Sequence, residues 1–356
     1  MSLAETFAQV AQLMRDGQAL ESRLSPESLA DAVRHYEQAI ALLRTLPVAQ
    51  LEVRHQLALA AMNRGNALQR QNTPETLDRA VHAYDEAIAF FRTLPLDSLV
   101  DARNSLGAAW MNRGHVFHLK NDPASLVESV RCQQEAISIL STLPLDSHPS
   151  FRLNLAAAWM NQANALLAID EDDRAADAAR ESISIASPGE RQHPALADVA
   201  LKARRARCEA IGRILYRSSR RNEPTDALAD EASDLVDDGL SLARHWESQG
   251  VSHFRPTATR LYAFGAQLYR LHLPDFLAEF LLEHLDPDQS PGALPSSPEL
   301  HFIASDTLAQ AKLDLESRQQ VFLDNPHTAR LLDRLRTFRE ASARLADLRT
   351  RFLPQT

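Results

Sequence analysis

The chain has 356 residues, of which 45% are hydrophobic and 24% charged, and its formal net charge is −9 at pH 7. This length allows two or three ordinary domains or one long repeat array. Only 10 residues are glycine, which argues against a turn-rich all-β fold and against Gly-x-Gly phosphate-binding loops. The acidic balance argues against general nucleic-acid binding, which needs a basic surface.

Neither a signal peptide nor a membrane-spanning segment is expected. Residues 1–5 lack the basic and apolar regions of a signal peptide. The uncharged stretch 153–169 contains three asparagines and a glutamine, and it is shorter than the ~20 apolar residues that a spanning helix needs. Cys132 and Cys208 are too few for a disulfide framework and are expected to fill apolar positions in helices. A cytoplasmic protein is therefore expected.

One motif recurs along the first two-thirds of the chain. Residues 61–68, 110–117 and 159–166 read AMNRGNAL, WMNRGHVF and WMNQANAL, and each copy starts 49 residues after the previous one. Weaker copies surround Gly17, Gly212 and Gly265. A fixed period of this size indicates a repeat architecture.

Prolines mark the helix boundaries inside each copy. A first set follows Ser, Thr or Asp, which is the pattern of an N-cap residue before the first helical position. These prolines are Pro26, Pro74 and Pro123. A second set lies in Thr-Leu-Pro and is expected to end the helix, because proline cannot continue it. These are Pro47, Pro95 and Pro144. Each copy therefore predicts two helices of about 20 residues.

This pattern resembles the tetratricopeptide repeat family. Members of that family pair a helix A, with a bulky residue four positions before a Gly or Ala, with a helix B that contains Ala, an aromatic residue and Ala. Here Trp110 and Gly114 match helix A, while Ala32, Tyr36 and Ala39 match helix B. The small residues are expected where two helices cross closely.

Two departures from the family pattern stand out. The period is 48–49 residues, whereas the usual repeat has 34. The family's apolar residue just before the glycine is replaced by Arg64, Arg113 or Gln162.

The resemblance implies an all-α fold, a right-handed α-solenoid of about six antiparallel helix pairs over residues 1–288. A Pro/Ser/Gly-rich loop is expected at 289–298, followed by capping helices over 299–356 that start near Ser297-Pro298-Glu299 and Asn325-Pro326. The pairs are predicted near 3–46, 50–94, 98–143, 147–187, 193–247 and 251–287.

The resemblance also implies that the A helices line a concave groove that binds a peptide. The groove positions lie three and two residues before the glycine and one, four and five residues after it. The candidate groove residues are Met62, Asn63, Asn66, Met111, Asn112, His115, Met160, Asn161, Asn164, Arg213, Tyr216 and Arg217.

Methionine and asparagine recur at two of these positions. Met14, Met62, Met111 and Met160 share one position, and Asn63, Asn112 and Asn161 share the next. An Asn amide can both donate to and accept from a peptide backbone, and Met offers an adaptable apolar surface. Two alternatives remain: the Asn bonds the neighbouring repeat while the Met packs between A helices, or recent duplication copied these residues.

Charge is unevenly distributed in the fifth copy. Residues 201–221 contain eight basic residues and one acid, and residues 223–238 contain seven acids and no base. The two helices are expected to neutralise each other. Alternatively, Arg213 and Arg217 receive an acidic or C-terminal carboxylate of a bound peptide, because Arg grips carboxylates in two places. The spacing of the family's carboxylate-clamp residues is not reproduced here.

No enzyme motif is recognisable in the sequence. His115 and His118 lie three apart on one helix, but no third metal ligand accompanies them, so neither a metal nor another cofactor is expected. The sequence therefore predicts a non-enzymatic scaffold that binds a protein or peptide, without nucleic acid or membrane partners. The alternative is a regulatory or sensor module that binds a small ligand or self-associates as a homo-oligomer.

Overall fold

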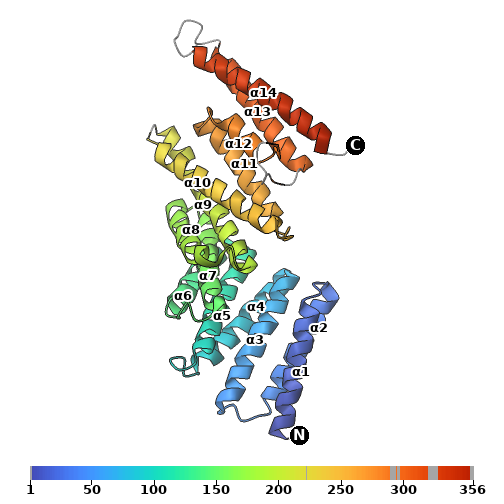
Figure 1. Ribbon diagram of the computed structural model, residues 1–356. Helices are drawn as coiled ribbons and strands as arrows, with labels where there is room; N and C mark the ends of the chain where they lie inside the picture. Colours follow the sequence, from blue (N-terminus) through green and yellow to red (C-terminus); the bar gives the residue numbers. More distant parts are fainter. Residues whose placement is uncertain (1, 222, 289–293, 295–296, 320–327, 353–356) are drawn as a thin grey trace. The chain divides into compact units, whose positions relative to one another are not determined.

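The structure is a computed structural model that describes residues 2–221, 223–288, 294, 297–319 and 328–352 (Figure 1). These residues form fourteen α-helices and one short 3-10 helix, and no strand occurs among them. Within the first unit described below, α1 to α8, each helix packs against the next one along the chain. The all-α prediction of stacked helix pairs is thereby confirmed.

The helices belong to two compact units, Met1–Ala186 and Ser187–Thr356. That the predicted pairs form one continuous array stays a prediction. The first unit contains four helix pairs: α1 (Leu3–Glu21) with α2 (Pro26–Leu43), α3 (Leu51–Gln71) with α4 (Pro74–Arg92), α5 (Val100–Lys120) with α6 (Pro123–Leu140), and α7 (Pro149–Leu167) with α8 (Asp172–Ala186).

The predicted helix starts in this unit are confirmed by the cap geometry. Ser25, Thr73 and Asp122 are N-caps whose side chains accept a backbone N–H three residues later, and proline follows each of them. The helix ends differ slightly from expectation. Helix α2 ends at Leu43 rather than at Leu46-Pro47, because the backbone turns through bonds to Leu42 and Leu43 before the proline is reached.

Close crossings of an A helix and its B helix explain the recurring glycine. A Cβ added at Gly17 would lie 2.6 Å from Cε1 of Tyr36, and one added at Gly65 would lie 2.8 Å from Cε1 of Tyr84. Both tyrosine rings are fully buried. Glycine is needed here because the aromatic ring occupies the space of its missing side chain.

The second unit contains the remaining helices. Helix α9 packs on α10, α10 on α11, and α11 on both α12 and α13, while α14 packs on α13 and α12. The second helix of the sixth predicted pair, α12, has only seven residues. The elements are η1 (Ser187–Gly189), α9 (Pro194–Arg220), α10 (Asp226–Glu247), α11 (Arg255–His272), α12 (Leu277–Glu283), α13 (Pro298–Gln319) and α14 (Thr328–Phe352).

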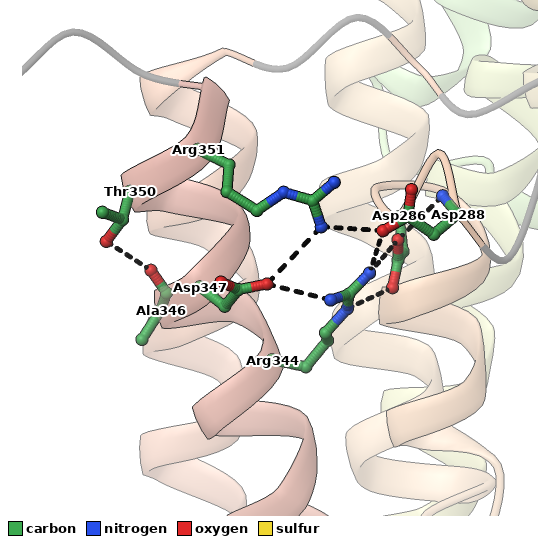
Figure 2. A network of polar contacts seen from close by, with 7 residues as sticks. All are labelled: Asp286, Asp288, Arg344, Ala346, Asp347, Thr350 and Arg351. Atoms are coloured by element: carbon green, nitrogen blue, oxygen red, sulfur yellow. Dashed lines mark hydrogen bonds and ion pairs between the residues drawn. The ribbon is translucent and has the colours of Figure 1, made fainter.

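The predicted C-terminal helices agree with α13 and α14, although the expected start at Asn325-Pro326 lies outside the described residues. Helix α14 is attached to the turn after α12 by ion pairs (Figure 2). Arg344 donates to both carboxylate oxygens of Asp286, at 2.6 and 2.9 Å, and to Asp288 at 2.6 Å. Arg351 donates to Asp288 at 2.7 Å.

None of the helices that the structure describes combines the length and apolar character of a membrane-spanning segment.

Candidate functional site

The predicted binding residues of the first unit lie on its A helices, α1, α3, α5 and α7. Each A helix packs against its own B helix and also contacts the next A helix, α1 with α3, α3 with α5 and α5 with α7. We call the surface of these four helices the A face. Polar side chains on the A face can therefore either bond a neighbouring A helix or remain open to a partner.

Asn66 joins three helices through hydrogen bonds. Its Oδ1 accepts from the hydroxyl of Tyr84 at 2.7 Å and from Nδ2 of Asn112 at 3.1 Å. The Tyr84 hydroxyl also lies 3.0 Å from Oε1 of Gln69. Burial, with the Glu21 charge as a smaller cause, raises the pKa of Tyr84, so its hydroxyl remains a donor. Asn112 thus bonds the neighbouring repeat, as one of the sequence alternatives predicted.

Asn63 and Asn161, the other two members of the asparagine series, do not bond a neighbouring repeat. The side chains of Asn63 and Asn161 are half-buried, and neither makes a hydrogen bond with any residue that the structure describes. Each amide therefore keeps one acceptor and two donor hydrogens for water or a bound chain. Asn164 differs again, since its Nδ2 lies 3.0 Å from the sulfur of Met160.

The methionine series packs into the unit. Met14, Met62 and Met111 are partly buried against the main apolar core. Met160 is buried, with 9% of its surface exposed. This packing is a structural role, as in the alternative that placed the Met side chains between A helices, although the contact found is with the core. The partly exposed surface of Met62 and Met111 is still available on the A face.

Two further polar contacts bridge neighbouring A helices, and the sequence reading missed both. Arg70 pairs with Glu21 at 3.0 Å, and the Tyr36 hydroxyl donates to the same carboxylate at 3.1 Å. Asn154 donates to Asn104 at 2.9 Å. The sequence holds one hint of the second contact: Asn104 and Asn154 are 50 residues apart, which is close to the 49-residue period and places them at similar positions of successive A helices.

The arginines that depart from the family pattern reach across to B helices. Arg64 pairs with Glu86 at 2.9 Å. Arg113 pairs with Glu128 at 2.7 Å and with Asp85 at 2.8 Å. Hydrogen bonds, first from Arg131 and then from Arg113, lower the pKa of Glu128 to about 2, so this carboxylate stays charged at neutral pH.

The two histidines on α5 lie side by side. The rings of His115 and His118 are stacked, with centroids 6.4 Å apart and planes 20° apart. Burial lowers the pKa of His118, so its ring is neutral at pH 7. The described part of the chain contains no group of three or more His, Cys, Asp or Glu side chains placed to hold a metal ion.

The cysteines are buried, as expected, and are free thiols. Burial is the largest cause that raises the pKa of Cys132 to about 11 and that of Cys208 to about 12. Both thiols therefore remain protonated at neutral pH, which makes them poor nucleophiles.

The remaining predicted binding residues belong to the second unit, on α9. Arg213 pairs with Glu209 of its own helix at 2.9 Å. Tyr216 is 65% exposed, and the Arg220 guanidinium lies 5.8 Å from its ring centroid.

The basic run on α9 has several partners. Arg207 pairs with Glu231 of α10, as mutual neutralisation of the two helices predicts. Arg204 instead makes two hydrogen bonds, at 2.8 and 3.0 Å, to the buried carboxylate of Glu190 just after η1.

The sequence matches no protein-family model, and a search of the curated proteins finds no match either.

Proposed function

We propose that this protein is a non-enzymatic scaffold that binds a peptide or protein segment along the A face, in the manner of tetratricopeptide repeats. The observation that carries the proposal is the repeated presentation of Asn63 and Asn161, whose half-buried amides share one repeat position and bond no described residue. An extended peptide offers backbone N–H and C=O groups that such amides can bind. We also propose a cytoplasmic location and no cofactor.

Asn66 and Asn112 have a different role in this proposal. They are bonded to each other, so they keep α3 and α5 in register. The same bond uses one of the two Nδ2 hydrogens of Asn112, so this amide has fewer groups to offer a peptide than Asn63 or Asn161. The proposed binding surface therefore includes fewer residues than the twelve candidates from the sequence.

Hydrogen bonds from the two amides do not by themselves give micromolar affinity. Each net hydrogen bond contributes about 0.5–1.5 kcal/mol, so two amides with one or two bonds each fall short of the ~8 kcal/mol needed for micromolar affinity. The rest is expected from apolar contact with the partly exposed Met62 and Met111. An acidic partner held by Arg213 and Arg217 stays a separate prediction, because these residues belong to the second unit.

The test is a peptide-display selection on the full-length protein, followed by affinity measurements on the selected peptides. Asn63→Ala combined with Asn161→Ala is expected to weaken binding about tenfold or more, with unchanged far-UV circular dichroism and melting temperature. The matched control is Gln134→Ala, which removes an exposed amide from the B helix α6. Selected peptides that bind the double variant as tightly as the wild type would refute a role for the A face.

A further inference from the structure

One side of the A helices in the first unit carries almost no charge. On α3, α5 and α7 this side follows the helical period through Asn63, Asn112 and Asn161, at the positions seven and four residues before each asparagine and three and seven residues after it. All of these positions are half-buried or exposed, five on each of the three helices. We call this set of fifteen residues the A-face stripe.

The A-face stripe is rich in amides and apolar residues. Seven of its fifteen residues are Asn or Gln, and only Arg70 is one of Asp, Glu, Lys and Arg, although 24% of the whole chain is charged. Charge is met at the two ends of the stripe on α3, where Arg70 pairs with Glu21 at 3.0 Å and Gln56 donates to Glu52 at 2.8 Å. The apolar members are Leu59, Ala108, Leu119, Ala157 and Ala168, the C-cap of α7.

The charged residues of the same helices lie on their other sides. Arg64 of α3 and Arg113 of α5 pair with carboxylates of B helices. Arg152 of α7 donates to the backbone carbonyl of Ile185 in α8 at 3.2 Å. The three helices are therefore not poor in charge as a whole, and the uncharged character belongs to the stripe.

A segment bound along the stripe would meet amides and apolar side chains in place of counter-charges. A Lys or Glu of that segment facing the helices would lose its water without gaining an ion pair, and this loss is costly. Backbone groups and uncharged polar side chains can instead bond the amides. Depletion of charged residues is also the compositional signal of the centre of a protein interface, where Met is enriched. The composition of the stripe thus indicates both a protein partner and a selection against charge of either sign.

We propose that the A-face stripe binds an extended segment of a partner protein whose residues facing the helices are uncharged, and that it rejects acidic and basic residues alike. This inference rests on the proposed function, because it names the class of segment that the A face binds. It is separate from the acidic partner predicted for Arg213 and Arg217, which belong to the second unit.

The experiment starts from a displayed peptide whose affinity for the full-length protein falls when Asn63→Ala and Asn161→Ala are combined. Each peptide residue is replaced by Ala to find the contact positions, and then by Lys, by Glu and by Gln, which has the length of Glu without its charge. At the contact positions, Lys and Glu are both expected to weaken binding about tenfold or more, and Gln less. Affinity should change by less than about twofold when the salt concentration is raised about tenfold, because no ion pair is screened.

A variant of the protein tests the same idea from the other side. Asn161→Asp adds one charge at nearly constant shape, so it should weaken the uncharged peptide and reduce the penalty of a nearby Lys substitution about tenfold. The matched control is Gln134→Glu, which makes the same change of charge at an exposed amide of α6 and should alter neither affinity. Melting temperatures verify that both variants are folded.

The outcomes separate this inference from the proposed function. A peptide that depends on Asn63 and Asn161 but binds equally well or better with Lys or with Glu at its contact positions overturns the inference and leaves the proposed function in place. A strong salt dependence of such a peptide does the same. If no selected peptide is affected by the double variant, the proposed function fails and this inference fails with it.

Discussion

At the residue scale, one repeat position controls how closely the helices of a pair approach. Gly65 meets the ring of Tyr84, whereas the same position in the third copy, Gly114, meets Gln133, with an added Cβ only 2.5 Å from Nε2. In the fourth copy Ala163 replaces glycine, and Ser182 stands at the position of the tyrosine. A larger residue on helix A thus coincides with a smaller one on helix B, as close packing requires.

Gly65→Ala should therefore destabilise the first unit. Alanine is the better helix former by about 1 kcal/mol, but overpacking a buried aromatic ring costs about 1–3 kcal/mol. The Tyr84 ring cannot move freely, because it is fully buried and its hydroxyl is bonded to Asn66. We expect a net loss of about 1 kcal/mol, measured by urea unfolding; an increase in stability would contradict this close crossing.

The asparagine series should separate into two classes when its members are replaced by alanine. Asn112→Ala removes the bond to Asn66 and should lower stability by about 1 kcal/mol. Asn63→Ala removes no described bond and should be neutral or stabilising by a few tenths of a kcal/mol, because alanine favours the helix. Urea unfolding of both variants makes the comparison, and equal losses would show that Asn63 is also structural.

At the element scale, local signals in the sequence predicted where helices begin better than where they end. Starts depend on a cap and a proline, which are adjacent in sequence, as at Ser25-Pro26. Ends depend on how the last turn packs. Helix α12 stops after seven residues, although the repeat pattern predicted a full B helix there, and α14 is then joined to the turn that follows α12.

That attachment makes a testable prediction about α14. Arg344→Met removes the hydrogen bonds to Asp286 and Asp288 (Figure 2) and should lower the hydrogen-exchange protection of α14. The control is Arg336→Met, which removes an exposed pair with Asp333 inside α14. Equal effects of the two variants would show that the contact with the turn does not hold α14.

The contact between α14 and the turn after α12 should weaken as the pH falls. Hydrogen bonds from Arg351 and Arg344 lower the pKa of Asp288 to about 2, and Arg344 likewise lowers the pKa of Asp286. A carboxyl group whose pKa is lowered in the folded state stabilises that state at pH values above the ordinary carboxyl pKa near 4. This contribution is lost as the pH falls toward 2. Protection of α14 in the wild type should fall over that range, while in Arg344→Met it should fall less.

At the scale of the whole molecule, the first unit contains its own apolar core. Its clusters draw on residues from Val10 to Ala158, all within Met1–Ala186. In repeat folds, stability comes from each repeat and its contacts with adjacent repeats. A unit with four packed pairs should therefore fold without the rest of the chain.

A fragment of residues 1–186 is expected to stay helical and to unfold cooperatively in urea. Far-UV circular dichroism across the denaturation curve measures both properties. The fragment should also retain the peptide affinity of the A face, because Asn63 and Asn161 lie within it. A broad, non-cooperative transition would show that the second unit is needed for folding.

The sequence by itself determined the helix pairs, their period and the small residues at the crossings. These features depend on local signals, such as caps, prolines and helical spacing, which the chain repeats. Only the tertiary structure decided which asparagine is bonded and which is open, and that Arg70 of α3 pairs with Glu21 of α1. Such pairings join segments about 50 residues apart, and they depend on how neighbouring helices pack, which no local pattern encodes.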